Sequence, residues 1–270
     1  MSAVIPYTIV VPSHRRVANM RHILHLFPDA LICVDEREEE AYREAVPRDQ
    51  LWLHPSHRDT MPRIRNWITD QAPTEAVVQI DDDLVHVLST VWRRPRKITD
   101  PAAIRQIIEN GINIAHDLGK SCYCWGRMRV SMAKNIPNLC PFAFTRLASS
   151  TFVTIGRAAP RFNDQLPFNS DIDFTLNLLL RERIVLQDTR FYINHGNIEG
   201  SDRGGLQGKR TAEGYEQWRR LMRAKWKSYV RIGRVPSVVN TGRGKWSQPS
   251  TLANRILVSR KSPLTRKRAE

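Results

Sequence analysis

The sequence predicts an α/β fold in which helices flank a mainly parallel β-sheet. From residue 7 to residue 80, short β-branched or apolar runs alternate with segments of helical apolar spacing, and this alternation is typical of a parallel sheet. Polar side chains stand where the predicted strands end, at the edge where open α/β sheets bind ligands. A length of 270 residues suits one such domain with an appendage.

The first part of the chain contains four predicted strands and the helices between them. The strands cover residues 7–11, 30–34, 51–53 and 77–80. Apolar spacing and punctuating prolines predict helices over residues 17–27, 36–45 and 62–71.

The pattern is looser after residue 83. Two helices with apolar stripes are expected over residues 101–118 and 171–183, and strands over residues 121–130, 152–155, 184–186 and 191–193. Five glycines within residues 200–214 predict a mobile loop, and a basic helix is expected over residues 215–231. We therefore expect a catalytic domain over residues 1–200 and a basic extension over residues 201–270.

The positive charge is concentrated in the last quarter of the chain. Residues 1–200 carry 24 Lys and Arg against 23 Asp and Glu, whereas residues 201–270 carry 18 against 4. The net charges are therefore +1 and +14 within a total of +15. Such an asymmetry favours a polyanionic partner, with nucleic acid as the leading candidate. A solvated basic tail without a specific partner is the alternative.

Basic residues alternate with tryptophans in this extension, a composition typical of nucleic-acid surfaces. The candidate DNA-binding residues are Arg219, Arg220, Arg223, Lys225, Lys227, Arg243 and Lys245. In the alternative interpretation, Trp218, Leu221, Met222 and Trp226 form the buried stripe of an amphipathic helix.

Hydropathy and cysteine usage favour a soluble, cytoplasmic protein, in the host cytoplasm if the source is viral. A membrane span needs about 18 consecutive apolar residues, and no stretch approaches this length. The first residues lack the pattern of a secretory signal. The cysteines are few, and we expect reduced core thiols; they are Cys33, Cys122, Cys124 and Cys140. Cys122 and Cys124 fit alternating strand positions better than a zinc site, because no second ligand pair accompanies them. No protein partner is evident.

The run Asp81-Asp82-Asp83 follows directly on the predicted strand 77–80. Adjacent carboxylates repel one another at neutral pH, and a divalent cation makes such a cluster tolerable. If the extended geometry continues, Asp81 and Asp83 point the same way and Asp82 points to the other face. The triplet is therefore a candidate site for Mg²⁺ or Mn²⁺.

The order of these segments resembles the GT-A glycosyltransferases over about residues 5–200. The motifs that carry the resemblance are strand ends at Ser13-His14 and Asp35, the basic helix Arg63-Ile64-Arg65-Asn66, the acidic triplet, Asn169-Ser170-Asp171-Ile172-Asp173, and Asn194-His195-Gly196. The resemblance implies a GT-A-like fold and a nucleotide-diphosphate sugar as donor. It implies donor contacts from Ser13, His14, Asp35, Arg63, Arg65, Asn66, Asp81 and Asp82, and metal contacts from Asp81, Asp83 and His195.

Several of these residues have a simpler alternative role. Arg63 and Arg65 lie on different helix faces, so only one is expected to face the donor, and Arg65 is preferred. By resemblance, Asp82 would bind ribose or sugar hydroxyls and Asp35 would read the base, whereas Asp35 could equally cap a helix. His195 could be an ordinary surface residue.

Asp171 is the first choice for the catalytic base of an inverting transfer, and Asp173 is the second. Helix capping is the alternative for both, because acidic residues are favoured in the first turn. The stereochemistry stays open.

Together, these features resemble the DNA glycosyltransferases of bacteriophages and their relatives associated with base-oxidising hydroxylases. We therefore expect metal-dependent transfer of a sugar from a nucleotide sugar to a hydroxyl on a modified pyrimidine in double-stranded DNA. Two alternatives are a metal-dependent nucleotidyltransferase or nuclease and a non-catalytic nucleic-acid-binding module. The sequence does not identify the sugar, the donor nucleotide or the acceptor base.

Overall fold

The computed structural model describes residues 5–92, 95–127, 140–148, 151–195 and 211–227. The chain divides into two units, Met1–Lys209 and Arg210–Glu270, and each is described by itself. Within the described ranges, every helix is too short or too polar to cross a membrane.

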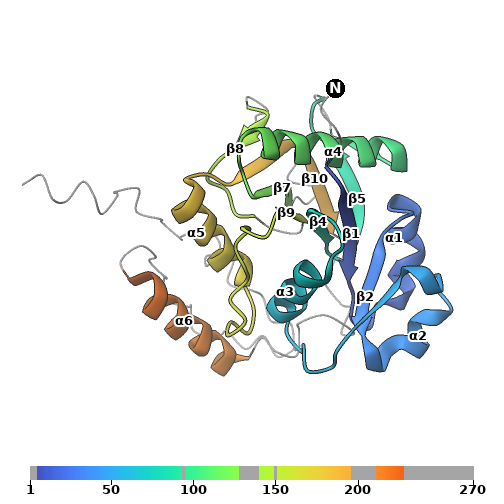
Figure 1. The fold of residues 1–270 in the computed structure, drawn as a ribbon, viewed down its shortest axis with the longest axis horizontal. Helices are drawn as coiled ribbons and strands as arrows, with labels where there is room; N and C mark the ends of the chain where they lie inside the picture. Colours follow the sequence, from blue (N-terminus) through green and yellow to red (C-terminus); the bar gives the residue numbers. More distant parts are fainter. Residues whose placement is uncertain (1–4, 93–94, 128–139, 149–150, 196–210, 228–270) are drawn as a thin grey trace, which may run out of the picture. The chain divides into compact units, whose positions relative to one another are not determined.

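The first four strands form a parallel half-sheet in the first unit (Figure 1). They are β1 (Tyr7–Pro12), β2 (Leu31–Asp35), β3 (Leu51–His54) and β4 (Ala76–Ile80). β1 lies between β2 and β4 and pairs in parallel with both. All five residues of β4 are buried, as expected for a strand covered on both faces.

The remaining strands extend the sheet in the order β3-β2-β1-β4-β9-β7-β10-β5-β6, with β8 paired to β10. They are β5 (Leu84–Ser89), β6 (Arg96–Ile98), β7 (Cys122–Arg127), β8 (Phe142–Ala143), β9 (Thr151–Ile155) and β10 (Leu186–His195). β9 is antiparallel to β4 and β7, whereas β7 and β10 are parallel. The sheet is thus mixed, and the prediction of an α/β fold is confirmed.

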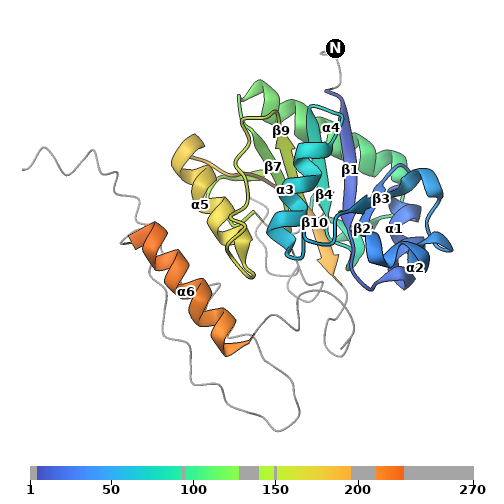
Figure 2. The same ribbon diagram turned by 60° about the horizontal axis from the view of Figure 1, so that its bottom comes forward.

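Helices cover both faces of the sheet (Figure 2). On one face, α1 (Met20–Leu26), α2 (Glu39–Arg43) and α4 (Pro101–Asp117) contribute to the largest apolar core. On the other face, α3 (Met61–Gln71) packs around Ile68, and α5 (Ser170–Glu182) packs around Phe174. Short 3-10 turns, Val17–Asn19, Glu36–Glu38 and Arg48–Gln50, precede α1, α2 and β3. The second unit contains α6 (Ala212–Trp226).

Local chemistry explains where the long helices begin. Asp100 caps α4 by accepting a hydrogen bond of 3.0 Å from the backbone N of Ala102, and a proline follows the cap. Thr211 caps α6 through the backbone N of Gly214 at 3.1 Å. This helix begins at Ala212 and ends at Trp226, earlier at both ends than the expected 215–231.

Two features of the sheet differ from the expectation. β5, β6 and β8 were not predicted; β6 and β8 have only three and two residues, and β5 directly follows the acidic triplet, where no strand was expected. The expected strands 184–186 and 191–193 form one strand, β10, because the intervening Asp188 is buried in a network. Its carboxylate accepts hydrogen bonds from the Arg190 side chain at 2.8 and 3.0 Å and from the Tyr123 hydroxyl at 3.1 Å.

The cysteines follow the expectation with one exception. All four are free; Cys33, Cys122 and Cys124 are buried, but Cys140 is exposed. Cys122 and Cys124 occupy alternating positions of β7 and pack with Phe174 on one face of the sheet, as predicted. The expected loop 200–214 lies largely outside the described residues.

Candidate active site

Four strands deliver polar residues to one edge of the sheet. β1 is followed by Ser13 and His14, β2 ends at Asp35, β4 precedes the acidic triplet, and β10 ends at His195. The pairing pattern makes all four strands run in the same direction, so their carboxyl ends meet at this edge. The edge is the one at which open α/β sheets bind ligands.

Asp81, Asp83 and His195 form a cluster of potential metal ligands. One ligand atom from each residue lies within 4.8 Å of the others. Nδ1 of His195 contacts Oδ1 of Asp83, and the His195 side chain is only 3% exposed. Nε2 of His195 is buried and has no hydrogen-bond partner in the described part of the chain. Two carboxylates and an imidazole with an unsatisfied nitrogen fit a divalent cation.

Arg65 lies beside this cluster, whereas Arg63 does not. Nη2 of Arg65 is 2.5 Å from Oδ1 of Asp81, and its guanidinium stacks 4.5 Å from the centre of the Phe152 ring. Nη1 of Arg65 is buried without a hydrogen-bond partner among the described residues. Arg63 instead pairs at 3.1 Å with Asp59 on the outer face of α3. The two arginines therefore face different directions, and Arg65 retains a donor for a substrate.

Asp82 is buried and is not part of the group of potential metal ligands. Oδ2 of Asp82 accepts a hydrogen bond of 2.9 Å from Ser13, and Oδ1 forms an ion pair with Nη1 of Arg16. Burial raises the pKa of Asp82, and Arg16 and Ser13 oppose this rise. Both carboxylate oxygens of Asp82 thus have protein partners, and its expected role in binding sugar hydroxyls stays a prediction.

Two other predicted donor residues are engaged within the protein. Asn66 exchanges two hydrogen bonds with the backbone of Phe162, at 2.8 and 2.9 Å, and so ties α3 to the segment before α5. The Ser13 hydroxyl is buried between Asp82 and the hydroxyl of Tyr42, which is 2.7 Å away. Both side chains thus have protein partners, and their expected contacts with the donor stay predictions.

The two candidate bases differ in their surroundings. Burial raises the pKa of Asp171; Arg65 lowers it, and Asp81 raises it further. We call Asp81, Asp83 and His195 the metal cluster. The electrostatic interactions with Arg65 and Asp81 place Asp171 in the same region of the protein. Asp173 is completely buried and accepts a hydrogen bond of 3.1 Å from Asn177, one turn further along α5. The carboxylate of Asp173 is thus enclosed by the protein in this structure, and its role as the second candidate base stays a prediction.

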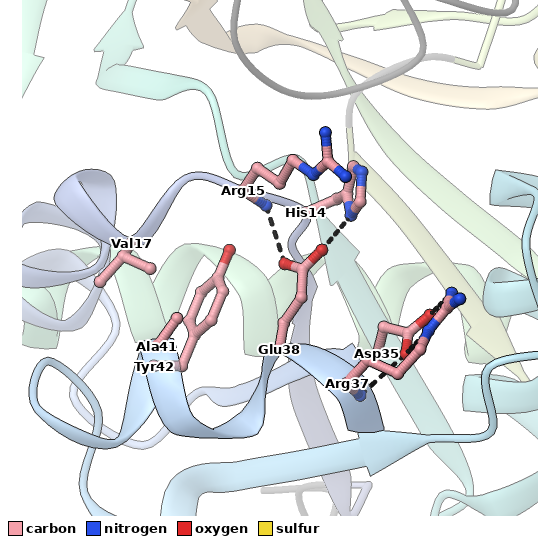
Figure 3. A pocket seen from close by; sticks show the side chains of 8 residues that line it. All are labelled: His14, Arg15, Val17, Asp35, Arg37, Glu38, Ala41 and Tyr42. Atoms are coloured by element: carbon pink, nitrogen blue, oxygen red, sulfur yellow. Dashed lines mark hydrogen bonds and ion pairs between the residues drawn. The ribbon is translucent and has the colours of Figure 1, made fainter.

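A pocket of about 330 Å³ lies at the ends of β1 and β2 (Figure 3). Its lining residues are His14, Arg15, Val17, Asp35, Arg37, Glu38, Ala41 and Tyr42. Asp35 caps the following turn through the backbone N of Arg37 and pairs with the Arg37 guanidinium at 2.6 Å. These bonds hold the pKa of Asp35 far below its usual range. The capping alternative is thus correct for Asp35, and the same residue also lines the pocket.

Residues 7–204 match the sequence profile described as TET-Associated Glycosyltransferase. The chain belongs to the TET-associated glycosyltransferase family. The expectation of a glycosyltransferase is therefore confirmed at the level of the family. No curated protein matches this glycosyltransferase significantly.

Solved structures similar to this TET-associated glycosyltransferase have low identity. Residues 1–349 of TarS from S. aureus are 12% identical, with a TM-score of 0.44 over 70% of this chain and 60% of that chain. The complex of that TarS fragment with UDP is 13% identical, with the same TM-score and coverage. A CMP:2-keto-3-deoxy-manno-octonic acid synthetase bound to CTP is 10% identical, with a TM-score of 0.40 over 81% of this chain and 99% of that chain. The glycosyltransferase spans about 60% of the TarS fragment.

The structure of this glycosyltransferase also adds site residues that the sequence analysis missed. Arg16 contacts Asp82 and lies 3.7 Å from Oδ2 of Asp83, and its backbone N donates to the Tyr42 hydroxyl at 3.0 Å. Burial raises the pKa of Tyr42. Glu38 binds His14 and the backbone of Arg15. The basic run at residues 14–16, directly after a predicted strand, could have indicated Arg16 as a site residue. No sequence pattern indicates the role of Glu38.

The basic helix α6 presents most of its predicted DNA-binding residues to solvent. Arg220, Arg223, Lys225 and Lys227 are exposed, whereas Arg219 is partly buried and lies 3.4 Å from Glu216. Trp218, Met222 and Trp226 are buried, so the alternative of an amphipathic stripe is correct for these side chains. Arg243 and Lys245 lie outside the described residues.

Proposed function

We propose that this protein transfers a sugar from a nucleotide-diphosphate sugar to a hydroxyl group on a modified pyrimidine base in double-stranded DNA. The observation that carries the proposal is the cluster of Asp81, Asp83 and His195, with Arg65 and Asp171 in the same region. A metal ligand set, a cation with a free donor and a carboxylate base are the groups that sugar transfer from a diphosphate requires.

The cluster would hold Mn²⁺ or Mg²⁺. Such an ion, when bound, supplies a Lewis acid that stabilises negative charge on a departing diphosphate. Hard oxygen ligands suit both ions, and the imidazole of His195 is tolerated better by Mn²⁺. Three carboxylates against the guanidinium groups of Arg16 and Arg65 leave a net negative charge, which favours entry of a cation.

Arg65 supports the donor from the protein side. One of its terminal nitrogens fixes Asp81, and the other is buried and unpaired among the described residues. A buried guanidinium nitrogen without an acceptor is unfavourable, and a phosphate oxygen satisfies it with a charge-assisted hydrogen bond. Arg65 would therefore bind the diphosphate while it orients a metal ligand.

Asp171 is the base that we assign to the acceptor hydroxyl. Its raised pKa makes the carboxylate a better proton acceptor than an ordinary aspartate. It lies in the first turn of α5, in the electrostatic reach of Arg65 and Asp81. This arrangement supports an inverting transfer, in which the carboxylate takes the hydroxyl proton as the oxygen attacks the sugar.

Charge supports DNA as the acceptor. Residues 201–270 carry a net charge of +14, and three basic side chains of α6 and that of Lys227, directly after it, are exposed. Phosphate neutralisation by Lys and Arg supplies most of the non-specific affinity for DNA. The family name associates these glycosyltransferases with TET, which agrees with the resemblance to DNA glycosyltransferases that accompany base-oxidising hydroxylases. The acceptor base would be flipped out of the duplex to reach the site.

A transfer assay tests the proposal. The purified protein is incubated with Mn²⁺, a panel of labelled nucleotide-diphosphate sugars, and duplexes that contain either hydroxymethylated or unmodified pyrimidines. We expect label on the hydroxymethylated duplex with at least one donor, and loss of labelling with EDTA. Absence of label with every donor would contradict the proposal. Release of pyrophosphate or cleavage of the duplex would instead support a nucleotidyltransferase or a nuclease.

A further inference from the structure

Three basic side chains line the pocket at the ends of β1 and β2, and two of them contact carboxylates. Arg37 binds Asp35 through two nitrogens, at 2.9 and 2.6 Å. Nδ1 of His14 lies 2.5 Å from Oε1 of Glu38. The third cation, Arg15, is exposed, and its guanidinium makes no ion pair or hydrogen bond within the described part of the chain. Arg15 is thus the pocket cation available to an anionic ligand.

The backbone of Arg15 has an unusual conformation. Its φ is 55°, in the left-handed region that non-glycine residues rarely adopt. Oε2 of Glu38 accepts a hydrogen bond of 2.9 Å from the backbone N of Arg15, and the Glu38 side chain is only 17% exposed. Figure 3 shows both oxygens of Glu38 directed at the adjacent residues His14 and Arg15. Glu38 therefore holds a strained turn at the pocket.

The pocket and the metal cluster are joined by hydrogen bonds. Tyr42 lines the pocket, and its hydroxyl contacts Ser13 at 2.7 Å. Ser13 in turn donates to Asp82, which is adjacent in sequence to the ligands Asp81 and Asp83. A donor that lies in the pocket and extends toward the cluster would bring its phosphate oxygens near the turn after β1 that carries Arg15.

We propose that Arg15 binds an anionic group of the nucleotide-diphosphate donor and that Glu38 is a positioning residue that holds Arg15 in place. The inference deepens the proposed function and rests on it. An ordinary exposed arginine would need neither a left-handed backbone nor a largely buried carboxylate that binds its main chain. Both features fix the backbone of Arg15 at the pocket and so limit the positions that its side chain can reach.

The test uses the full chain and two substitutions with different effects. Arg15→Asn removes the guanidinium but keeps a residue that tolerates the left-handed conformation. Glu38→Ala removes the acceptor for the Arg15 backbone, whereas Glu38→Gln keeps an acceptor oxygen. Arg48→Gln is the matched control, because Arg48 is exposed and does not line the pocket. Dissociation constants for UDP, CDP, GDP and ADP are measured with Mn²⁺ by titration calorimetry, with the parent nucleosides as probes without phosphate.

We expect Arg15→Asn to weaken binding of the preferred nucleoside diphosphate by about tenfold, as for loss of a charge-assisted hydrogen bond. Binding of the parent nucleoside and the melting temperature should be unchanged. Glu38→Ala should also weaken diphosphate binding, Glu38→Gln should weaken it less, and the Arg15→Asn, Glu38→Ala double variant should bind like Arg15→Asn alone. Such non-additivity is the sign that Glu38 acts through Arg15.

Two results would overturn the inference. Arg15→Asn could bind the diphosphate as tightly as the wild type, or the losses of affinity in the two single variants could add. Both results leave the proposed function intact, since the wild type binds a nucleoside diphosphate in each case. If the wild type binds none of the four nucleoside diphosphates, the proposed function fails and the role of Arg15 fails with it.

Discussion

Nδ1 of His195 contacts the carboxylate of Asp83, although 112 positions separate these residues along the chain. The antiparallel pairing of β10 with β5 explains the contact, because it places His195 opposite Leu84, the residue after Asp83. A register shift between Asn194 and His195 accompanies this pairing. The metal cluster is therefore completed by His195, the last residue of β10, which lies far from the acidic triplet in sequence.

The first prediction concerns the metal. We expect Asp83→Asn and His195→Ala to weaken Mn²⁺ binding by about 100-fold or more, since changes outside the first ligand shell alone cost about 10- to 100-fold. Calorimetric titration with Mn²⁺ measures the effect. Asp49→Asn, at an exposed acid of the turn before β3, is the control. Unchanged affinity in both site variants would show that this cluster does not bind the ion.

The second prediction separates chemistry from binding at Asp171. Asp171→Asn should lower kcat by about 10²- to 10⁴-fold, the usual contribution of a positioned base, and leave the affinity for the donor unchanged. Steady-state kinetics with the labelled duplex provide the measurement, with Asp164→Asn at an exposed position as the control. A variant that keeps its kcat would assign the base role elsewhere.

The third prediction is the pH dependence of stability at Asp171. Its folded-state pKa is raised, so the native protein binds its proton more tightly than the unfolded chain. The carboxyl therefore disfavours folding once the pH exceeds its unfolded pKa, and this loss is complete above its folded pKa. We expect Asp171→Asn to raise the melting temperature at pH 7 and to differ little from the wild type at pH 3. A variant that is less stable at pH 7 would mean that the ionised carboxylate stabilises the fold.

The fourth prediction distinguishes a structural from a substrate role for Asp82. Removal of the carboxylate in Asp82→Ala takes the nearest acidic partner from the largely buried Arg16 guanidinium and one of two hydrogen-bond partners from the Ser13 hydroxyl. We expect the free energy of unfolding to fall by about 3 kcal/mol, as for a broken buried ion pair. Denaturant unfolding measures this change, with Asp49→Ala as the control. Normal stability combined with weakened donor binding would support the role in sugar recognition.

The fifth prediction concerns the exposed basic residues in the last turns of α6 and directly after it. Replacement of all four basic residues by alanine should reduce the salt dependence of DNA binding by about three to four units of slope, roughly one for each phosphate that is no longer neutralised. The changed residues are Arg220, Arg223, Lys225 and Lys227. The control with an equal change of charge replaces Arg21, Arg43, Arg48 and Arg105, which are exposed in the first unit. Equal slopes for both variants would refute a specific role for α6.

The predictability of the fold depended on whether a segment carries its own periodic signal. β1, β2, β4 and α4 have long apolar patterns or a capping sequence, and the sequence analysis located each to within a few residues. β10 was split in two because its polar centre is paired across the sheet, and no local pattern reveals a partner such as Tyr123. The short strands β6 and β8 exist through their pairing with β5 and β10.

The site residues, like the strands, could be predicted only where a local motif marks them. The acidic triplet and His195 were found from order and resemblance, and the structure brings Asp81, Asp83 and His195 together. The protein partners of Asp82 and Asp173 could not be predicted, because sequence alone does not show which carboxylates are enclosed by other side chains. Arg16 escaped notice because its importance comes from two acids more than 60 positions away.

The amino-acid sequence by itself determined the α/β class, the polar edge of the sheet, the acidic triplet and the basic extension, because these properties reside in composition and in local periodicity. Only the tertiary structure decided which acid faces the metal cluster, which arginine joins it, and that Glu38 holds Arg15 at the pocket. Those assignments depend on strand pairing and on burial, which are set by contacts between residues that are distant in sequence.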